Sequence, residues 1–298
     1  MNELLKCCML CPRKCGINRY NEKGYCGATN RIKLAYYSLH MWEEPIISGN
    51  TGSGTIFFSN CNMRCIYCQN KKISLDGYGV YISNKKLKEI MLLLQEKGAN
   101  NINLVTPTMY VPQIGKVLRK IKGNELKIPV VYNTSSYENI ITLKVIEGLV
   151  DVYLADLKYF DDELAYKYSG VKDYFETATL AIDEMFRQVG FIVINDNLLK
   201  KGLIVRVLVL PGEVDDSKKI IEYLYKTYGD EIIISIMSQY TPVNKCKYDN
   251  LNRKLDKSEY EEVVKYAEEL GITNAFIQEG DSSEESFIPD FNTNIINK

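Results

Sequence analysis

The chain has 298 residues, of which 46% are hydrophobic and 25% charged, a composition typical of a folded protein with one or two domains. Lysine and arginine number 37 against 38 acidic residues, so the net charge does not favour nucleic acid as a ligand. No stretch approaches the roughly 20 apolar residues that span a membrane, and the short, early-charged N-terminus is unlike a signal peptide. Nine cysteines without a secretion signal predict a reducing, cytoplasmic location, where thiols bind metals.

The N-terminal region contains a first set of cysteines. Cys8, Cys11, Cys15 and Cys26 have the spacing C-x2-C-x3-C-x10-C, and prolines and glycines divide the stretch into turns. A small, turn-rich segment buries little apolar surface and needs a cross-link, which four thiolates supply by binding a metal. Thiolate quartets bind zinc and iron–sulfur clusters alike, so the spacing predicts a second metal centre of either kind, and unbound structural cysteines are the alternative.

Regular elements begin with weak alternation at residues 32–37, which predicts an edge strand. From residue 54 onward, apolar runs alternate with amphipathic helical patterns. The predicted strands cover residues 54–60, 101–106, 128–133, 151–157, 202–210 and 231–237, with a short last strand at 274–278. The predicted helices cover residues 84–97, 111–121, 139–149, 161–190, 217–228 and 258–270, the last one capped by Ser258.

Six strong β/α units with apolar strands predict a parallel sheet covered by helices, in the α/β class. A closed barrel requires eight such units, so six predict a partial (β/α)6 TIM-like barrel, here over residues 51–280. A cysteine-rich metal-binding extension over residues 1–50 precedes it, and a polar tail over 281–298 follows. In such architectures the functional site lies at the carboxyl ends of the strands.

A second set of cysteines lies directly after the first barrel strand. Cys61, Cys65 and Cys68 are spaced C-x3-C-x2-C, which lets three sulfurs converge on one inorganic centre. Structural zinc sites normally close with four protein ligands, and iron–sulfur clusters are usually held by four cysteines. A 4Fe–4S cluster held by three would keep one iron open for a ligand. A redox pair at Cys65 and Cys68 and a zinc knuckle are the alternatives, although His40 is the single histidine and is distant in sequence.

These cysteines, with the aromatic Tyr67 before the last one, resemble the signature of the radical S-adenosylmethionine (SAM) enzymes. More narrowly, residues 59–70 and the Asp156-x-Lys158 pair resemble uncharacterised relatives of pyruvate formate-lyase activating enzyme, over residues 8–278. The resemblance implies an oxidoreductase whose 4Fe–4S cluster binds the amino and carboxylate groups of SAM. One electron, from a donor such as flavodoxin or ferredoxin, then yields methionine and a 5′-deoxyadenosyl radical that abstracts a hydrogen atom.

The resemblance leaves the substrate open. The leading expectation is activation of a glycyl radical enzyme, a partner protein that would receive a backbone radical. Modification of another protein, a peptide or a small molecule is the nearest alternative. A further alternative is a protein of a different functional class, which binds zinc or acts in redox chemistry but does not catalyse a reaction.

Polar residues at other strand ends are candidates for binding SAM. Asp156 and Lys158 are two apart, so they share a face of the strand, and the resemblance places them at the ribose and carboxylate of SAM. Asn133 and Ser135 suit a ribose or carboxylate, although such residues also cap helices. Arg206 interrupts an apolar strand, where a charge must be paired or ligand-bound, and the resemblance places it near SAM.

One family feature is missing. The activating enzymes usually have a Gly-Gly-Glu run after the second strand, whose backbone holds the SAM amino group, but here Thr106-Pro-Thr108 follows it. Backbone carbonyls of this turn are expected to keep that role, with a simple strand-exit turn as the alternative. Gln239–Pro242, Gln278 and Glu279 are expected at the substrate opening, and no side chain is assigned a catalytic role.

Overall fold

The computed structural model describes residues 3–243 and 245–278. In this part of the chain, ten strands form one sheet in the order β10-β9-β8-β6-β5-β4-β2-β1-β3, with β7 paired to β8. Seven strands are parallel: β2 (Ser53–Phe58), β4 (Ile102–Val105), β5 (Val130–Thr134), β6 (Val152–Asp156), β8 (Leu198–Leu208), β9 (Ile233–Met237) and β10 (Ala275–Ile277). The antiparallel strands are β1 (Ile32–His40), β3 (Val80–Ile82) and β7 (Val193–Asn195).

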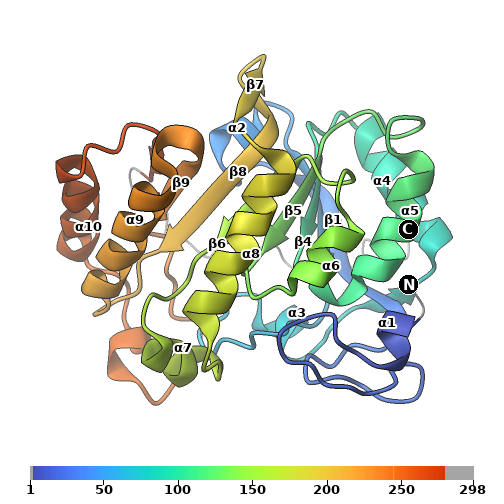
Figure 1. Ribbon diagram of the computed structural model, residues 1–298, viewed down its shortest axis with the longest axis horizontal. Helices are drawn as coiled ribbons and strands as arrows, with labels where there is room; N and C mark the ends of the chain where they lie inside the picture. Colours follow the sequence, from blue (N-terminus) through green and yellow to red (C-terminus); the bar gives the residue numbers. More distant parts are fainter. Residues whose placement is uncertain (1–2, 244, 279–298) are drawn as a thin grey trace.

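Helices cover the outer face of this curved sheet (Figure 1). The longer ones are α4 (Asn84–Glu96), α5 (Val111–Ile121), α6 (Ile140–Val145), α7 (Asp162–Ser169), α8 (Tyr174–Val189), α9 (Val214–Tyr228) and α10 (Lys257–Glu269). Short helical turns are α1 (Glu3–Lys6), α2 (Pro45–Ser48), α3 (Lys71–Ser74), η1 (Thr108–Tyr110), η2 (Gly229–Glu231) and η3 (Asp249–Asn252). None of the helices in the described residues is long and apolar enough to cross a membrane.

The predicted α/β class and partial TIM-like barrel are confirmed. The apolar runs form adjacent parallel strands because both faces of the sheet are covered, and every residue of β2 is buried. The six predicted strands are β2, β4, β5, β6, β8 and β9, and the short last strand is β10. The barrel core lies between this sheet and the amphipathic helices.

Some local expectations were wrong. The strand predicted at an edge is β1, which lies between β2 and β3, because β3 is a three-residue, partly exposed strand that leaves little pattern. The helical stretch predicted over 161–190 is present as two helices, α7 and α8, because Gly170, with a φ of 61°, ends α7 in a left-handed turn. The last helix is capped by Asp256 in a capping box with Glu259, so Ser258 lies inside α10. The tail over 281–298 and Glu279 lie outside the described residues.

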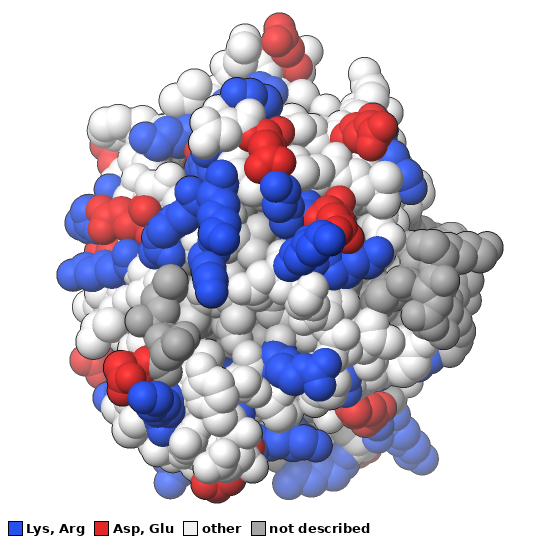
Figure 2. All heavy atoms as spheres, turned by 90° about the vertical axis from the view of Figure 1, so that its right-hand side faces the viewer, with Lys and Arg blue, Asp and Glu red and all other residues white. Residues whose placement is uncertain are grey.

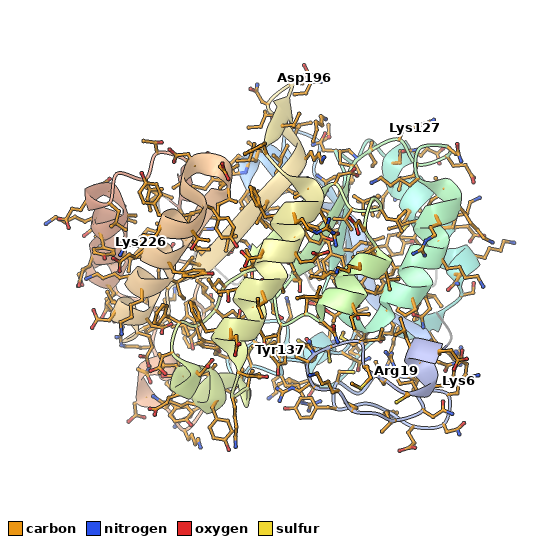
Figure 3. The ribbon with its side chains drawn as sticks, in the orientation of Figure 1. Lys6, Arg19, Lys127, Tyr137, Asp196 and Lys226 are labelled. Atoms are coloured by element: carbon orange, nitrogen blue, oxygen red, sulfur yellow. The ribbon has the colours of Figure 1, made fainter. Side chains whose placement is uncertain are left out.

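The N-terminal segment lies at the end of the barrel to which the parallel strands point (Figure 1). Arg19 anchors it there: the side chain is 1% exposed, and its Nη1 donates to the Met109 carbonyl oxygen at 2.7 Å. Its Nη2 donates to the Thr29 carbonyl, which joins two turns of the segment. Figure 3 shows Arg19 and Tyr137 on this side of the molecule. The segment is thus packed on the carboxyl ends of the strands.

The surface to the right in Figure 1, where α4 and α5 lie, is viewed directly in Figure 2. Lysine and arginine side chains are numerous there, with acidic side chains between them. One opposite-charge contact joins Lys88 of α4 to Glu125 beyond α5 at 2.6 Å. This mixture of signs follows from the near balance of charges in the sequence.

A buried carboxyl group in the segment before α6 joins η1 to β5. Glu138 is 2% exposed, and its Oε1 accepts hydrogen bonds from Thr108, Thr134 and Tyr132 at 2.6, 2.6 and 3.1 Å. Burial raises the pKa of Glu138 to about 7, although these hydroxyl donors oppose the shift. The folded protein therefore favours the neutral form of this side chain below that pH.

The first prediction concerns the pH dependence of stability. Glu138 has a higher pKa in the folded chain than in the unfolded one. The free energy of unfolding of the wild type should therefore fall as the pH rises from the unfolded-state pKa to the folded-state pKa. Above the folded-state pKa, the effect of Glu138 on stability should no longer change with pH. The fall should be about 3 kcal/mol relative to Glu138→Gln, which keeps the accepting oxygen but cannot ionise. Urea unfolding of both proteins between pH 4.5 and 8 measures this difference. Parallel pH profiles would contradict it.

Candidate functional site

A cavity of about 770 Å³ opens at the carboxyl ends of the parallel strands. Its walls come from β2, β4, β5, β6, β8, β9 and β10 and from the loops that follow several of them. The predicted site residues that line it are Cys61, Cys65, Tyr67, Cys68, Asn133, Ser135, Asp156, Lys158 and Arg206. Gln239, Thr241 and Gln278, expected at the substrate opening, line the same cavity. Residues up to 217 positions apart in the sequence, from Cys61 to Gln278, are thereby brought to one space.

The loop after β2 presents its thiols to one end of this cavity. Asn60 and Arg64 adopt left-handed φ values of 77° and 60°, which fold the loop back on itself within a few residues. The Asn62 side chain donates to the Tyr137 carbonyl at 2.7 Å, and the Ile66 backbone donates to the Tyr168 carbonyl at 3.0 Å. The loop is thus held from two sides by the segments that follow β5 and β6.

The three thiols have the chemistry of a cluster-binding set. All are free, and Cys65 is 6% exposed while Cys61 and Cys68 are partly buried. Ser169 donates its hydroxyl to the Cys65 sulfur at 2.9 Å, and Ser74 to the Cys68 sulfur at 3.3 Å, as donors to a thiolate would. Burial, together with the smaller effect of the neighbouring Cys65 thiol, raises the pKa of Cys61 to about 12. Such thiols ionise when a positive centre compensates for burial, as a bound metal does.

The donor set is suited to a group larger than one ion. In residues 3–243 and 245–278, no three histidine, cysteine or acidic side chains gather closely enough to hold a single metal ion. Sulfurs on one zinc lie about 4 Å apart, given Zn–S bonds of about 2.3 Å. Three free thiols at one end of a ligand-sized cavity are donors of the kind that an iron–sulfur cluster takes.

Tyr67 closes the wall behind the thiols. Its side chain is buried, and its hydroxyl accepts a hydrogen bond from Tyr159 at 2.8 Å. Tyr159 also lies 2.7 Å from the Ser169 hydroxyl that contacts Cys65. The aromatic residue predicted next to Cys68 thus belongs to a hydroxyl chain that ends at a thiol.

A buried charged network forms the floor of the cavity. Asp156 and Lys158 contact each other through Oδ2 and Nζ at 2.8 Å, and both face the cavity as their spacing predicted. Burial alone would raise the pKa of Asp156, but the positive charges of Arg206 and Lys158 outweigh it and lower the pKa. The two residues do not form an exposed surface ion pair, because both side chains are at least four-fifths buried.

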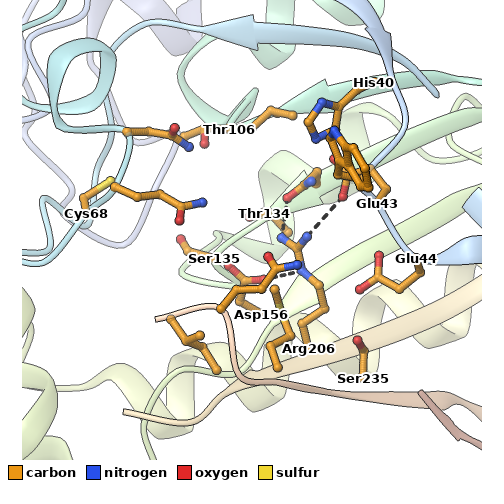
Figure 4. Close-up of a pocket in the computed structure, with 18 of the residues that line it drawn as sticks. His40, Glu43, Glu44, Cys68, Thr106, Thr134, Ser135, Asp156, Arg206 and Ser235 are labelled. Carbon is orange, nitrogen blue, oxygen red and sulfur yellow. Dashed lines mark hydrogen bonds and ion pairs between the residues drawn. The ribbon is translucent and has the colours of Figure 1, made fainter. Parts of the chain in front are cut away.

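Arg206 lies at the centre of this network (Figure 4). Its Nε donates to Asp156 at 2.7 Å, its Nη2 to the Asn133 side-chain oxygen at 2.8 Å, and its Nη1 to Glu43 at 3.3 Å. Asp156 and Arg206 are register partners in the β6–β8 pair, which places the two side chains next to each other. The charge in an apolar strand is paired, as the sequence required.

Glu43 and Glu44 are site residues that the sequence analysis missed. They lie between β1 and α2, and both line the cavity beside Arg206. Two acidic residues before a proline do not form a recognisable sequence motif. Only their position beside the sheet in the folded structure identifies them as site residues. His40 also lines the cavity, and its ring meets the Phe57 ring edge-on, with the ring centres 6.3 Å apart.

The turn that replaces the Gly-Gly-Glu run is strained. Thr106 has a φ of 54°, which a β-branched residue rarely adopts, and it lines the cavity. Its backbone nitrogen donates to the Asn133 carbonyl at 2.9 Å. Asn60, Thr106 and Ser136, which follow the neighbouring strands β2, β4 and β5, are all left-handed. The backbone is bent at each of these strand ends around the cavity.

The N-terminal cysteines lie outside the cavity but close to the thiol loop. Cys8, Cys11 and Cys26 are buried, and a Cβ on Gly24 would lie 3.5 Å from the Cys26 sulfur and 3.8 Å from the Cys15 sulfur. Burial raises the pKa of Cys11 to about 12, and the Cys26 and Cys8 thiols act in the same direction.

Arg13, between Cys11 and Cys15, connects this segment to the thiol loop. It donates to the carbonyls of Asn62, Met63, Ser169 and Gly170 at 3.0, 3.4, 3.2 and 2.7 Å. Two of these carbonyls belong to the loop between Cys61 and Cys65, and Ser169 contacts the Cys65 sulfur. One guanidinium therefore joins the two cysteine sets.

A partial α/β barrel with three thiols and a buried charged network at its strand ends defines a protein that binds an inorganic cofactor next to a polar organic ligand. Comparison with known proteins specifies the family. Residues 55–224, more than half of the chain, match the family model of the radical SAM superfamily. An uncharacterized protein of Methanocaldococcus jannaschii is 33% identical over 284 residues, which is 90% of this chain and 76% of that protein.

Solved structures share the fold. Streptococcus suis SuiB bound to S-adenosylmethionine matches with a TM-score of 0.52 and 16% identity, over 74% of this chain and 48% of SuiB. SuiB has also been solved with its precursor peptide SuiA. HydG, a maturase of the [FeFe]-hydrogenase, matches with a TM-score of 0.51 and 15% identity, over 76% and 52% of the two chains. The chain thus spans about half the length of the solved structures that it matches.

The chain belongs to the radical SAM superfamily. The superfamily fold implies a 4Fe–4S cluster and SAM as cofactors and a SAM-dependent radical reaction.

The second prediction tests the network around Arg206. Arg206→Leu leaves Glu43 buried without a cation and leaves Asp156 with Lys158 alone, so the free energy of unfolding should fall by about 3–5 kcal/mol. The control Arg187→Leu breaks ion pairs of an arginine that is 52% exposed, and it should lower the free energy of unfolding far less, because solvent screens exposed pairs. Urea unfolding followed by circular dichroism compares the two. Equal losses would show that Arg206 is not an internal counter-ion.

Proposed function

We propose that Cys61, Cys65 and Cys68 bind the 4Fe–4S cluster and that the adjoining cavity holds SAM and the substrate. The observation that carries this proposal is the convergence of three free thiols and one buried charged network on a single cavity of about 770 Å³. A cluster held by these three thiols would supply the electron that splits SAM reductively into methionine and a 5′-deoxyadenosyl group able to take a hydrogen atom from the substrate. Ligand pockets of about 300–1,000 Å³ are the usual size for organic ligands, so both molecules have room.

The chain's own residues would orient SAM and exclude water. Lys158 lies where its charge acts on both Cys65 and Cys68, so its ammonium is placed to pair with a carboxylate at the thiol end. Asn133, Ser135 and Asp156 offer amide, hydroxyl and carboxylate groups for the ribose and the amino group. Tyr67 forms the buried wall beside them. Arg206 holds Asp156 and Asn133 in position.

We favour a small molecule or a peptide side chain as the hydrogen donor. The cavity is deep and its floor is charged, which suits a group that enters it and is recognised there. SuiB, which shares the fold, binds a precursor peptide. Activation of a glycyl radical enzyme is the second candidate, favoured by the Asp156-x-Lys158 pair and by residues 59–70 that resemble the activating enzymes. Incubation with deuterated candidates, following label into 5′-deoxyadenosine, distinguishes them.

We further propose that residues 1–50 form a metal-binding extension, with Cys8, Cys11, Cys15 and Cys26 around a second centre. Three of these thiols are buried in a turn-rich segment, and metal binding would draw the four together. Between the two metals we favour an iron–sulfur cluster over zinc. The contacts of Arg13 with the thiol loop suit a role in receiving electrons from a small donor such as flavodoxin or ferredoxin, in the cytoplasm.

The third prediction tests cluster binding at the barrel. Cys65→Ala should abolish formation of 5′-deoxyadenosine from SAM after anaerobic reconstitution and reduction by dithionite, because two thiols no longer hold the cluster with one open iron. The control Cys246→Ala removes a partly buried thiol that does not line the cavity, and it should keep the activity. Chromatography of the reaction products measures both variants. Wild-type deoxyadenosine formation by Cys65→Ala would refute the assignment.

The fourth prediction concerns the second centre. With Cys61, Cys65 and Cys68 all replaced by Ala, the protein should still bind iron and sulfide through Cys8, Cys11, Cys15 and Cys26. Elemental and sulfide analysis decides the result, with Cys7→Ala in the same background as the control for an exposed, adjacent thiol. One zinc per chain would indicate a structural site instead of a cluster. The absence of both metals would refute the second centre.

A further inference from the structure

One carboxylate in the cavity has no partner for one of its oxygens. Glu44 is 9% exposed, and its buried Oε2 makes no hydrogen bond. The side chain does not cap α2, although Glu44 is the residue at which that short helix begins. Figure 4 shows the carboxylate turned toward Arg206 and the cavity, with Ser235 below it. Within the fold, the Ser235 hydroxyl and the charge of Arg206 act on this carboxyl group, but Oε2 is left without a hydrogen bond.

The neighbouring Glu43 is different, because both of its oxygens are occupied. Its Oε1 accepts from the Asn103 side chain at 2.9 Å, and its Oε2 contacts Arg206 at 3.3 Å. Arg206 in turn uses its three nitrogens on Asp156, Glu43 and Asn133. Each nitrogen of the guanidinium thus bonds to a residue other than Glu44.

The charges that line the cavity do not balance. Among the described residues the walls hold three carboxylates, Glu43, Glu44 and Asp156, but two cations, Lys158 and Arg206. Lys158 pairs with Asp156, and Arg206 bridges Asp156 and Glu43, so the surplus negative charge lies at Glu44. Burial raises the pKa of Glu44 and Glu43 raises it further, while Arg206 opposes the shift. A buried carboxylate in this state gains stability when a cation binds it.

The position of Glu44 indicates which cation. It lies across Arg206 from Cys68, at the end of the cavity away from the thiols (Figure 4). The partly exposed side chains of Met41 and Trp42 line the same cavity and provide apolar surface for an alkyl chain. No group of three ligating side chains for a metal ion occurs in residues 3–243 and 245–278. A compact ammonium, which donates three hydrogen bonds, suits the Glu44 carboxylate and the Ser235 hydroxyl beside it.

We infer that the end of the cavity at Glu44 is a substrate subsite for an alkylammonium group, with Glu44 as its counter-ion. This inference rests on the proposed function, since it describes the substrate of the same cavity. It places the cationic end of the substrate away from the thiols and directs the attached carbon chain along the cavity toward them. The substrate class is then a primary amine, such as a free amino acid, a diamine or a lysine side chain.

Trp42 is the only tryptophan in the chain, so intrinsic fluorescence reports on this subsite directly. The experiment titrates n-butylammonium chloride into the anaerobically reconstituted holoprotein at saturating SAM and constant ionic strength. Saturating SAM prevents the probe from occupying the site of the SAM amino group. We expect a saturable fluorescence change with n-butylammonium and none with 1-butanol, which has the same chain without the charge.

The variant Glu44→Gln should weaken binding of n-butylammonium at least tenfold. The matched control is Glu138→Gln, which also replaces a buried glutamate with an unpartnered Oε2 but lies outside the cavity, and it should bind the probe as the wild type does. Equal affinities of the wild type and Glu44→Gln, equal responses to the amine and the alcohol, or no saturable binding would each overturn the inference. The comparison of amine with alcohol uses wild-type protein, so it holds even if Glu44→Gln does not fold.

The two proposals fail in different ways. Wild-type protein that does not bind SAM after reconstitution contradicts the proposed function, and the amine titration is then not interpreted as a substrate site. Wild-type protein that binds SAM but does not discriminate the amine from the alcohol contradicts only the subsite. SAM binding by equilibrium dialysis therefore precedes the titration.

Discussion

The candidate site depends on one guanidinium. Arg206 enters the cavity from β8 and contacts side chains from β6, β5 and the β1–α2 connection. These segments are distant in sequence. Without a shared cation, the carboxylates that they carry would repel each other, and their buried polar atoms would lack hydrogen-bond partners. The same contacts keep Asp156 ionised, because Arg206 and Lys158 hold its pKa low. The arginine thus sets both the shape and the charge of the cavity floor.

The second constraint is the contact between the two cysteine sets. Arg13 reaches from the N-terminal segment to carbonyls on both sides of Cys65, while Arg19 anchors the same segment to the turn after β4. Backbone carbonyls accept these bonds, so the docking does not require particular side chains in the thiol loop. The N-terminal segment has a small apolar cluster around Leu5 and Leu10, and the arginine contacts fix this segment to the barrel. A change in the first segment is therefore transmitted to the loop that carries Cys61, Cys65 and Cys68.

The charge at Glu44 gives the cavity two distinct ends. Thiols and Lys158 occupy one end, and a surplus carboxylate with exposed apolar side chains occupies the other. Arg206 separates them and leaves Glu44 unpaired by using all of its nitrogens elsewhere. The two ends of the cavity stabilise different charges, an anionic group near Lys158 and a cationic group near Glu44. A ligand that carries both charges is therefore bound in one orientation.

The sequence by itself determined the repeating strands and helices, the thiol loop and the Asp156-x-Lys158 pair, since each depends on local spacing or on period. It also indicated that Arg206 needed a partner, because a charge in an apolar run is costly. Only the tertiary structure decided that this partner set includes Glu43, that β1 lies inside the sheet, and that Arg13 reaches the thiol loop. The physical reason is that these contacts join residues far apart in the chain. Strand register and loop docking bring them together, and neither leaves a pattern in neighbouring residues.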